Sequence, residues 1–270
     1  MATSKTAKKK ASPAPRKRKP AGGAVQTSTT TVTSTTNPAT GPSTTSLQTF
    51  DLLELQQYTK EKVYSTTASK DFHLYYVGRD DVHSILKYVL SRVTVSLYLN
   101  MFGFDDDELN AIIMQKAVDP NITVMITLDK SQAGGMHEKQ LLASDLAQNS
   151  AAYNTSFVIG ESATKQISHT KGFVADGKVA AEGSTNWSSS GEGTFVIVTE
   201  PGGTGYKAQN NTQSIITDPD TISRFTAELI AEHMSARATA PAGMKSSQKD
   251  PTNITPKKTP VQPLAKFASK

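Results

Sequence analysis

Five residues between positions 169 and 186 have the side-chain types of a nucleophile and an anion-binding group. His169 and Lys171 are separated by one residue, and Asp176, Ser184 and Asn186 follow in the same segment. A neutral imidazole can act as a nucleophile or carry a proton, whereas an ammonium, a hydroxyl and an amide can hold anionic oxygens. The segment therefore predicts a nucleophile placed beside an anion clamp.

The spacing also predicts how these side chains are brought together. Alternate residues of a strand point to the same face, so we expect His169 and Lys171 to lie side by side. The dipeptide at 176–177, Asp-Gly, is a strong hairpin turn signal. A return strand then brings Ser184 and Asn186 back beside His169. The competing interpretation is an ordinary β-hairpin with a surface histidine and lysine.

These residues match a longer pattern. It reads His169-x-Lys171, four residues, Asp176, six residues, and then Gly183-Ser184-x-Asn186. The segment resembles the HKD motif of the phospholipase D superfamily, with every spacing intact. Six fixed identities would agree by chance in a chain of this length with a probability on the order of 10⁻⁵. The resemblance covers roughly residues 70–236.

The resemblance implies a metal-independent phosphodiesterase that needs no cofactor and forms a covalent phosphohistidine. It implies that His169 is the nucleophile and that Lys171, Ser184 and Asn186 hold the non-bridging phosphate oxygens. Asp176 belongs to the motif, but its position in the turn accounts for it. We therefore interpret Asp176 as structural support for the site.

A complete site in this superfamily contains two such motifs, and this chain has one. His73 and His83 have no lysine two positions later. His137-x-Lys139 is a near match, but its aspartate comes one residue too late, and the spacing of the leucines nearby favours an amphipathic helix with charged outer residues. One motif per chain predicts a homodimer with a composite active site.

The partner that orients the His169 ring is left open by the sequence. In related single-motif endonucleases, an acidic residue just before the next strand supports the ring. The nearest equivalents here are Asn211, Thr212 and Gln213, and Glu192 is an alternative. Residues 200–207 are an additional stretch that we expect to form a loop at the site.

Charge divides the chain into three parts. Residues 1–45 carry eight Lys/Arg and no acid, and residues 237–270 carry seven against one acid, whereas the whole chain has a net charge of +5. The part between them is therefore strongly acidic, with a net charge of −9. We expect a disordered basic and then Ser/Thr-rich tail over 1–46, a catalytic domain over 47–236, and a disordered basic tail over 237–270.

Several classes of protein are excluded by composition. The chain has no cysteine, which rules out disulfides, a thiol nucleophile and Cys-ligated zinc. It has neither a run of 18 apolar residues nor an apolar segment behind the basic N-terminus, so we expect no membrane-spanning helix and no signal peptide. These features favour a cytoplasmic protein, or a nuclear one in a eukaryotic host.

Apolar periodicity predicts alternating strands and helices between positions 72 and 236. Strands are expected at 72–77, 93–99, 121–128, 155–159, 172–175, 179–182, 195–199 and 214–216, and helices after Asp80 or Asp81, after the acidic run 105–108, over 134–147 and over 218–236. This alternation predicts an α/β fold with helices on both faces of a mixed sheet. A helix N-terminus explains the acidic run better than a cation site does. For Trp187, packing beside the loop is favoured over stacking on a ligand.

The sequence leaves the substrate open. The acidic body argues mildly against a broad nucleic-acid groove, but flexible basic tails add affinity for polyanions without reading sequence. DNA or RNA is the favoured substrate, because no amphipathic membrane helix is evident. One alternative is a hydrolase of phospholipid headgroups whose basic tails bind an anionic membrane surface. Another is a non-catalytic scaffold that binds nucleic acid.

Overall fold

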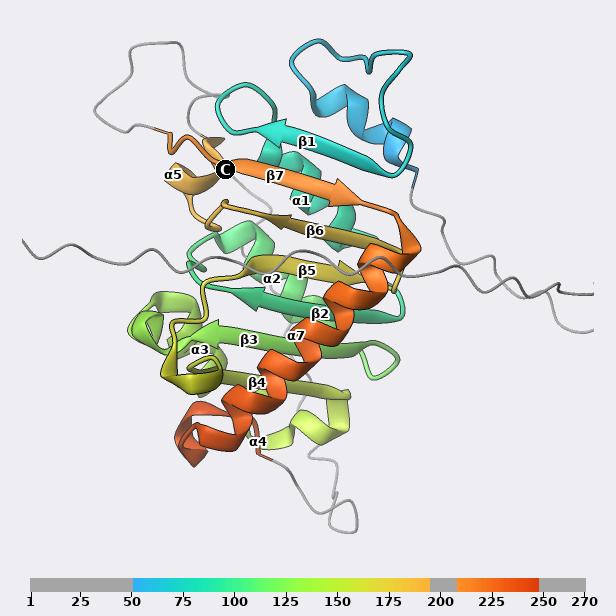
Figure 1. Cartoon of the computed structure of the whole chain (residues 1–270). Helices are drawn as coiled ribbons and strands as arrows, with labels where there is room; N and C mark the ends of the chain where they lie inside the picture. Colours follow the sequence, from blue (N-terminus) through green and yellow to red (C-terminus); the bar gives the residue numbers. More distant parts are fainter. Residues whose placement is uncertain (1–50, 195–207, 248–270) are drawn as a thin grey trace, which may run out of the picture. The chain divides into compact units, whose positions relative to one another are not determined.

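The computed structural model describes residues 51–194 and 208–247 (Figure 1). The expected tail over 1–46, most of the expected C-terminal tail, the expected strand at 195–199 and the loop at 200–207 lie outside these residues.

A single mixed sheet organises the described residues. Its seven strands have the order β1-β7-β6-β5-β2-β3-β4. They are β1 (Phe72–Tyr76), β2 (Ser96–Met101), β3 (Thr123–Asp129), β4 (Thr155–Gly160), β5 (Lys171–Ala175), β6 (Val179–Gly183) and β7 (Thr212–Ile216). Strands β2, β3 and β4 are parallel, and the other neighbouring pairs are antiparallel.

Helices join these strands. The α-helices are α1 (Val82–Ser91), α2 (Asp107–Ala117), α3 (Met136–Ala143), α4 (Asp145–Asn149), α5 (Ser189–Glu192) and α7 (Pro219–Thr239). The short 3-10 helices are η1 (Leu52–Tyr58), η2 (Lys130–Gln132), η3 (Ser150–Tyr153), η4 (Ala163–Lys165) and η5 (Ala242–Met244).

The helices form two layers, one on each face of the sheet. Helix α7 crosses one face, and α1 and α2 cover the other (Figure 1). Under α7, Val174 and Ala180 of the sheet pack against Ile222 and Leu229. The larger apolar core lies on the other face and includes fully buried Leu86 of α1. The predicted α/β/α arrangement around a mixed sheet is therefore confirmed.

Aspartate side chains start the main helices, as the sequence indicated. Asp81 accepts a hydrogen bond from the backbone N–H of Ser84, and Asp106 accepts one from Leu109. Asp218 does the same for the long C-terminal helix, where Pro219 occupies the first turn. These caps satisfy backbone N–H groups that have no partner within the helix.

Two predicted elements differ from the structure. The helix expected over 134–147 is divided at Ser144, whose extended backbone ends α3 and begins α4. The strand expected over 93–99 begins only at Ser96. Residues 93–95 instead form the turn out of α1, and the side chain of Asp176 holds their backbone.

The folded body extends beyond Ala236, where the sequence placed its end. Helix α7 continues to Thr239, and the Arg237 guanidinium donates hydrogen bonds to the carbonyl of Phe157 and to the hydroxyl of Ser246. Lys245 forms a β-bridge with Val158 at the edge of the sheet. Arg237 and Lys245 therefore belong to the folded body, although their charges were assigned to the tail.

No described helix is both long and apolar enough to span a membrane.

His233 of α7 is fully buried against the sheet. Its Nδ1 is hydrogen-bonded to Thr127 Oγ1 and its Nε2 to Ser156 Oγ, both at 2.9 Å. Burial, together with the nearby Arg237 charge, lowers the pKa of His233 from 6.5 to about 4. The folded state therefore requires the neutral imidazole.

We expect His233 to weaken the fold in acid. Because the pKa is depressed on folding, its contribution is fully present above pH 6.5 and is lost as the pH falls toward 4. The loss should be about 3 kcal/mol in the free energy of unfolding. Urea unfolding of wild type and His233→Gln at pH 7 and pH 4 measures it, since only wild type should lose this amount. An equal pH dependence in both proteins would contradict the assignment.

Candidate active site

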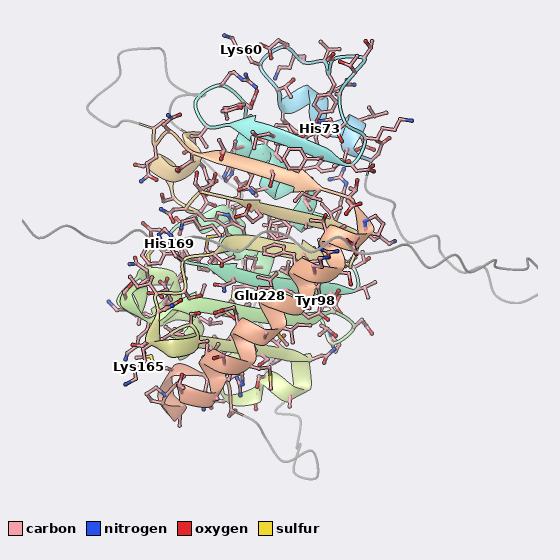
Figure 2. All side chains as sticks on the ribbon, in the orientation of Figure 1. Lys60, His73, Tyr98, Lys165, His169 and Glu228 are labelled. Carbon is pink, nitrogen blue, oxygen red and sulfur yellow. The ribbon has the colours of Figure 1, made fainter. Side chains whose placement is uncertain are left out.

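The predicted site residues lie mainly at one end of the sheet. In the strand register, Met101 at the end of β2 pairs with Lys171 at the start of β5, and Gly183 at the end of β6 pairs with Gln213 of β7. His169 is exposed and precedes β5 by two residues, and it lies beside the strand ends in Figure 2. One end each of β2, β5, β6 and β7 therefore lies at the site that the sequence predicts.

His169 and Lys171 meet around the ring of Phe102. The Phe102 and His169 rings are 4.6 Å apart between centroids, in an edge-to-face arrangement, and Lys171 Nζ lies 5.2 Å from the Phe102 centroid. The ammonium donates a hydrogen bond to the His169 carbonyl at 2.8 Å. Lys171 is in the strand, as predicted, but His169 is in the segment before it. The lysine thus holds the backbone of the histidine.

Lys171 is a buried cation. Only 4% of its surface is exposed. This burial lowers the pKa of Lys171, and the Glu182 carboxylate opposes the effect by raising it. A desolvated ammonium interacts more strongly with an anionic ligand than an exposed one does, because less water screens it.

Two buried polar residues hold the chain just before His169. The backbone N–H of Ser168 donates to Asp129 Oδ2 at 2.6 Å, and the Ser168 hydroxyl donates to Asn100 Oδ1 at 2.9 Å. Asp129 is the last residue of β3 and Asn100 the last but one of the neighbouring strand β2, so they tie the segment before His169 to the sheet. Neither Asp129 nor Asn100 could be recognised from the sequence, because no local pattern marks a contact between positions so far apart.

Ser184 is engaged with the start of β7. Its hydroxyl accepts a hydrogen bond from the Thr212 N–H at 3.0 Å and donates one to Asn211 Oδ1 at 3.2 Å. Its own backbone N–H donates to the Thr212 carbonyl. The side chain is exposed at the end of the sheet, where a phosphate oxygen could replace Asn211 as its acceptor.

Asn186 lies against the segment that carries Phe102. A Cβ atom on Gly103 would lie 3.0 Å from the Asn186 side chain, so glycine allows this close approach. The Trp187 N–H donates to the Gly103 carbonyl at 2.8 Å. Asn186 Oδ1 is buried and has no hydrogen-bond partner in the described part of the chain. Residues 102–103 thus connect the surroundings of His169 with Asn186.

Asp176 lies at the other end of β5, in the turn that leads to β6. Its φ is +54°, and its carboxylate accepts hydrogen bonds from the backbone N–H groups of Thr94, Val95 and Ser96 and from the Thr94 hydroxyl. These contacts fix the entry into β2.

The residues proposed to orient the His169 ring have different environments in the structure. Glu192 Oε2 lies 2.5 Å from Nδ1 of His83, so this carboxylate is paired with a different histidine. Asn211 binds Ser184 and, through Nδ2, the Gly191 carbonyl. Gln213 is buried beside Gly183, and its Oε1 has no hydrogen-bond partner among the described residues. Thr212 contacts its neighbours Ser184 and Thr185 only through its backbone, so Thr212 and Gln213 both remain as candidates.

The near-match histidine has a different environment from the one expected. His137 is on helix α3, as predicted, but its side chain and that of Glu138 are buried rather than outward-facing. His137 packs beside Phe104, with ring centroids 5.5 Å apart. Trp187 is also buried, against Phe104 and Phe173, as the packing interpretation predicted.

No protein-family model and no curated protein matches the sequence. Similar solved structures include Nuc from Salmonella typhimurium, a phospholipase D family member. The two sequences are 15% identical, the match covers 62% of this chain and 95% of Nuc, and the TM-score is 0.45. NucT from Helicobacter pylori has 16% identity, with 61% and 96% covered and a TM-score of 0.44. Phosphatidylserine synthase from Haemophilus influenzae Rd KW20 has 12% identity, with 73% and 43% covered and a TM-score of 0.45.

We expect Asp176→Ala to destabilise the fold rather than impair chemistry. The change removes the acceptor for backbone N–H groups of three residues. Alanine keeps a β-carbon at the positive φ but lacks the carboxylate contacts that stabilise this conformation. The free energy of unfolding should fall by about 2–4 kcal/mol. Asp176→Asn, which keeps one acceptor oxygen, should lose less. A large fall in turnover per folded Asp176→Asn molecule would contradict this structural role.

Proposed function

We propose that the chain is a metal-independent phosphodiesterase of the phospholipase D type that acts as a homodimer on nucleic acid. The observation that carries the proposal is an unbroken HKD motif in which the imidazole of His169 is exposed and the ammonium of Lys171 is buried and binds the His169 carbonyl. The exposed ring is accessible to a macromolecular substrate. The buried cation supplies charge where a phosphate would bind.

The proposed reaction has two steps. An imidazole nitrogen of His169 attacks phosphorus, a bond forms between them, and the bond from phosphorus to the leaving oxygen breaks. A second imidazole donates a proton to that oxygen. The same second imidazole then takes a proton from water, whose oxygen attacks the phosphohistidine and releases His169.

The other motif residues would stabilise the charge that develops on the phosphoryl oxygens. Lys171 offers a desolvated ammonium, and Asn186 offers an amide next to Gly103. Ser184 offers a hydroxyl whose present acceptor is a side chain, Asn211 Oδ1. Hydrogen-bond donors held in place before the reaction stabilise a transition state without the cost of reorganisation.

The second imidazole is proposed to come from a second copy of the chain. In-line displacement requires the nucleophile and the proton donor on opposite sides of phosphorus. Among the other histidines, His73, His137 and His233 are buried, and His83 is bound to carboxylates. A two-fold axis beside the exposed His169 would supply the same side chain twice.

Charge supports nucleic acid as the substrate. The basic N-terminal 45 residues provide salt-dependent affinity for a long polyanion, which an acidic body alone would not. The same tails could bind an anionic membrane, so phospholipid headgroups are the second candidate. Assays against both substrate classes separate the two.

We expect His169→Ala to abolish turnover, because the nucleophile and its partner imidazole are both lost. Lys171→Ala should retain activity lowered on the order of 10²–10³-fold. Cleavage of single-stranded DNA, duplex DNA, RNA and phosphatidylcholine vesicles in EDTA measures both effects. Normal activity in His169→Ala would overturn the proposal, and activity on vesicles alone would assign the second candidate.

The composite site predicts dominant inhibition by an inactive chain. After subunit exchange with a ninefold excess of His169→Ala, only about one tenth of the wild-type chains remain in wild-type dimers. Activity per wild-type chain should therefore fall to about one tenth. The control is the same mixture assayed before exchange. Sedimentation should also give about twice the 28.9 kDa chain mass. Full activity in a monomer would exclude the composite site.

A further inference from the structure

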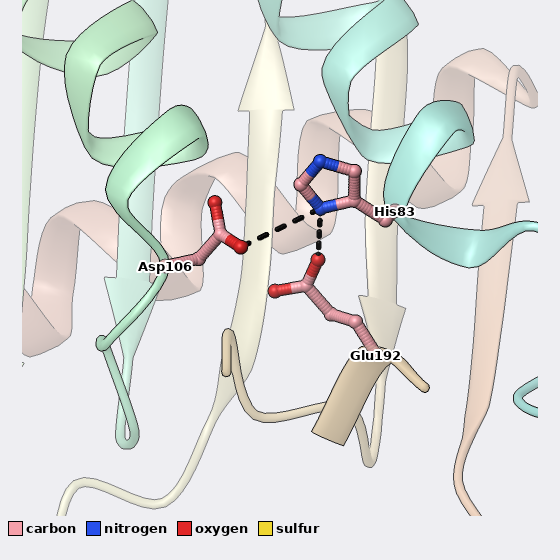
Figure 3. A group of neighbouring side chains, drawn as sticks. All are labelled: His83, Asp106 and Glu192. Atoms are coloured by element: carbon pink, nitrogen blue, oxygen red, sulfur yellow. Dashed lines mark hydrogen bonds and ion pairs between the residues drawn. The ribbon is translucent and has the colours of Figure 1, made fainter. Parts of the chain in front are cut away.

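A second group of chemistry-bearing side chains lies away from His169. His83 of α1, Asp106 at the N-terminus of α2 and Glu192 of α5 point toward one another (Figure 3). His83 Nδ1 lies 2.5 Å from Glu192 Oε2 and 3.5 Å from Asp106 Oδ2. One nitrogen and two oxygen atoms, all within 4.8 Å of one another, therefore face a common point.

The ring of His83 is held so that Nδ1 faces this point. Its other nitrogen, Nε2, lies 2.8 Å from Glu108 Oε2, and the Lys87 ammonium contacts the other oxygen of Glu108. The Glu108 carboxylate keeps a proton on Nε2, so Nδ1 can bind a metal ion that displaces the proton it shares with Glu192. Metal-binding histidines are commonly oriented by a carboxylate in this way.

Asp106 and Glu192 each have an oxygen available at this point. Asp106 uses Oδ1 to cap α2, which leaves Oδ2 toward His83. Glu192 is fully buried, and its Oε1 lacks a hydrogen-bond partner within the described ranges. Figure 3 shows this second oxygen turned to the side of Asp106. A proton shared with His83 satisfies one Glu192 oxygen and leaves the other unsatisfied, which is costly for a buried carboxylate.

The local charge also favours a cation. Three carboxylates, from Asp106, Glu108 and Glu192, surround His83, and Lys87 is the one lysine that contacts them among the described residues. The three carboxylates outnumber the single lysine, and a divalent cation would neutralise this excess negative charge.

We propose that His83, Asp106 and Glu192 bind a divalent transition-metal ion of the Zn²⁺ type, through Nδ1 and one oxygen of each carboxylate. Ligands about 2.1 Å from a tetrahedral ion lie about 3.4 Å apart, so side-chain movements of about 1 Å convert the present arrangement. An imidazole ligand favours Zn²⁺ over Mg²⁺ and Ca²⁺, which prefer oxygen. His83 and Asp106 are partly exposed, which gives the ion a route in.

The ion would join two segments that shape the proposed active site. Asp106 ends the segment that begins with Phe102, and Glu192 ends the segment that contains Asn186. Backbone hydrogen bonds already connect them, from Asp105 N–H to the Trp187 carbonyl and from Trp187 N–H to the Gly103 carbonyl. The metal is therefore assigned a structural role, and the chemistry at His169 proceeds without it.

The test is metal binding by the full chain after removal of metal with a chelator. Equilibrium dialysis should give one Zn²⁺ per chain, and Co²⁺ should give visible absorption bands characteristic of nitrogen and oxygen ligands. Zn²⁺ at about 100 times its Kd should raise Tm by about 5–10 °C. Glu192→Gln keeps the shape of the side chain and should weaken binding at least 10-fold. Glu108→Gln should weaken it less.

Two variants serve as controls. Glu161→Gln removes an exposed carboxylate whose ion-pair partner is Lys130, and it should bind Zn²⁺ as wild type does. His169→Asn removes the exposed histidine of the proposed active site and should also bind normally. The proposal is overturned if wild type binds no Zn²⁺ tighter than about 0.1 mM, or if folded Glu192→Gln binds it as tightly as wild type. Loss of binding in His169→Asn would move the ion to the other site and equally reject this one.

Discussion

The site depends on the register of strand β5 between β2 and β6. Backbone hydrogen bonds pair Met101 with Lys171 on one side and Gly172 with Glu182 on the other. Because side chains alternate across a sheet, a shift of one residue would turn Lys171 to the face covered by α7. Phe173 and Ala175, on the same side of the strand as Lys171, are in the main core, and Val174 is in the cluster under α7. Core packing thus fixes the orientation of the buried lysine.

The same constraint extends to the segments at the ends of the strands. Phe102 follows β2 directly and contacts His169, while Gly103 lets Asn186 approach its backbone. Asp129, the last residue of β3, binds the backbone just before His169. The position of His169 therefore results from contacts with two separate parts of the chain, neither of which is adjacent to it in sequence.

The parts of this arrangement that could be predicted from the sequence are local ones. The HKD spacing, the turn at Asp176 and the capping of α1 and α2 depend on residues within a few positions of one another. The partners of Ser168 and the His83 cluster could not be predicted, because they join positions that only the tertiary fold brings together. Glu192 illustrates the limit. Its type suggested a partner for a histidine, but the fold placed it against His83 instead of His169.

The start of β2 shows how a long-range contact changes a local preference. Residues 93–95 have strand-forming side chains, yet the Asp176 carboxylate binds the backbone N–H groups of Thr94, Val95 and Ser96 and ends the ladder there. One carboxylate thus ties the turn between β5 and β6 to the entry of β2, at the end of the sheet opposite His169. Since β2 and β5 are neighbours, this contact supports at one end the register that places Lys171 at the other. A motif residue can therefore be required for the active site without touching the substrate.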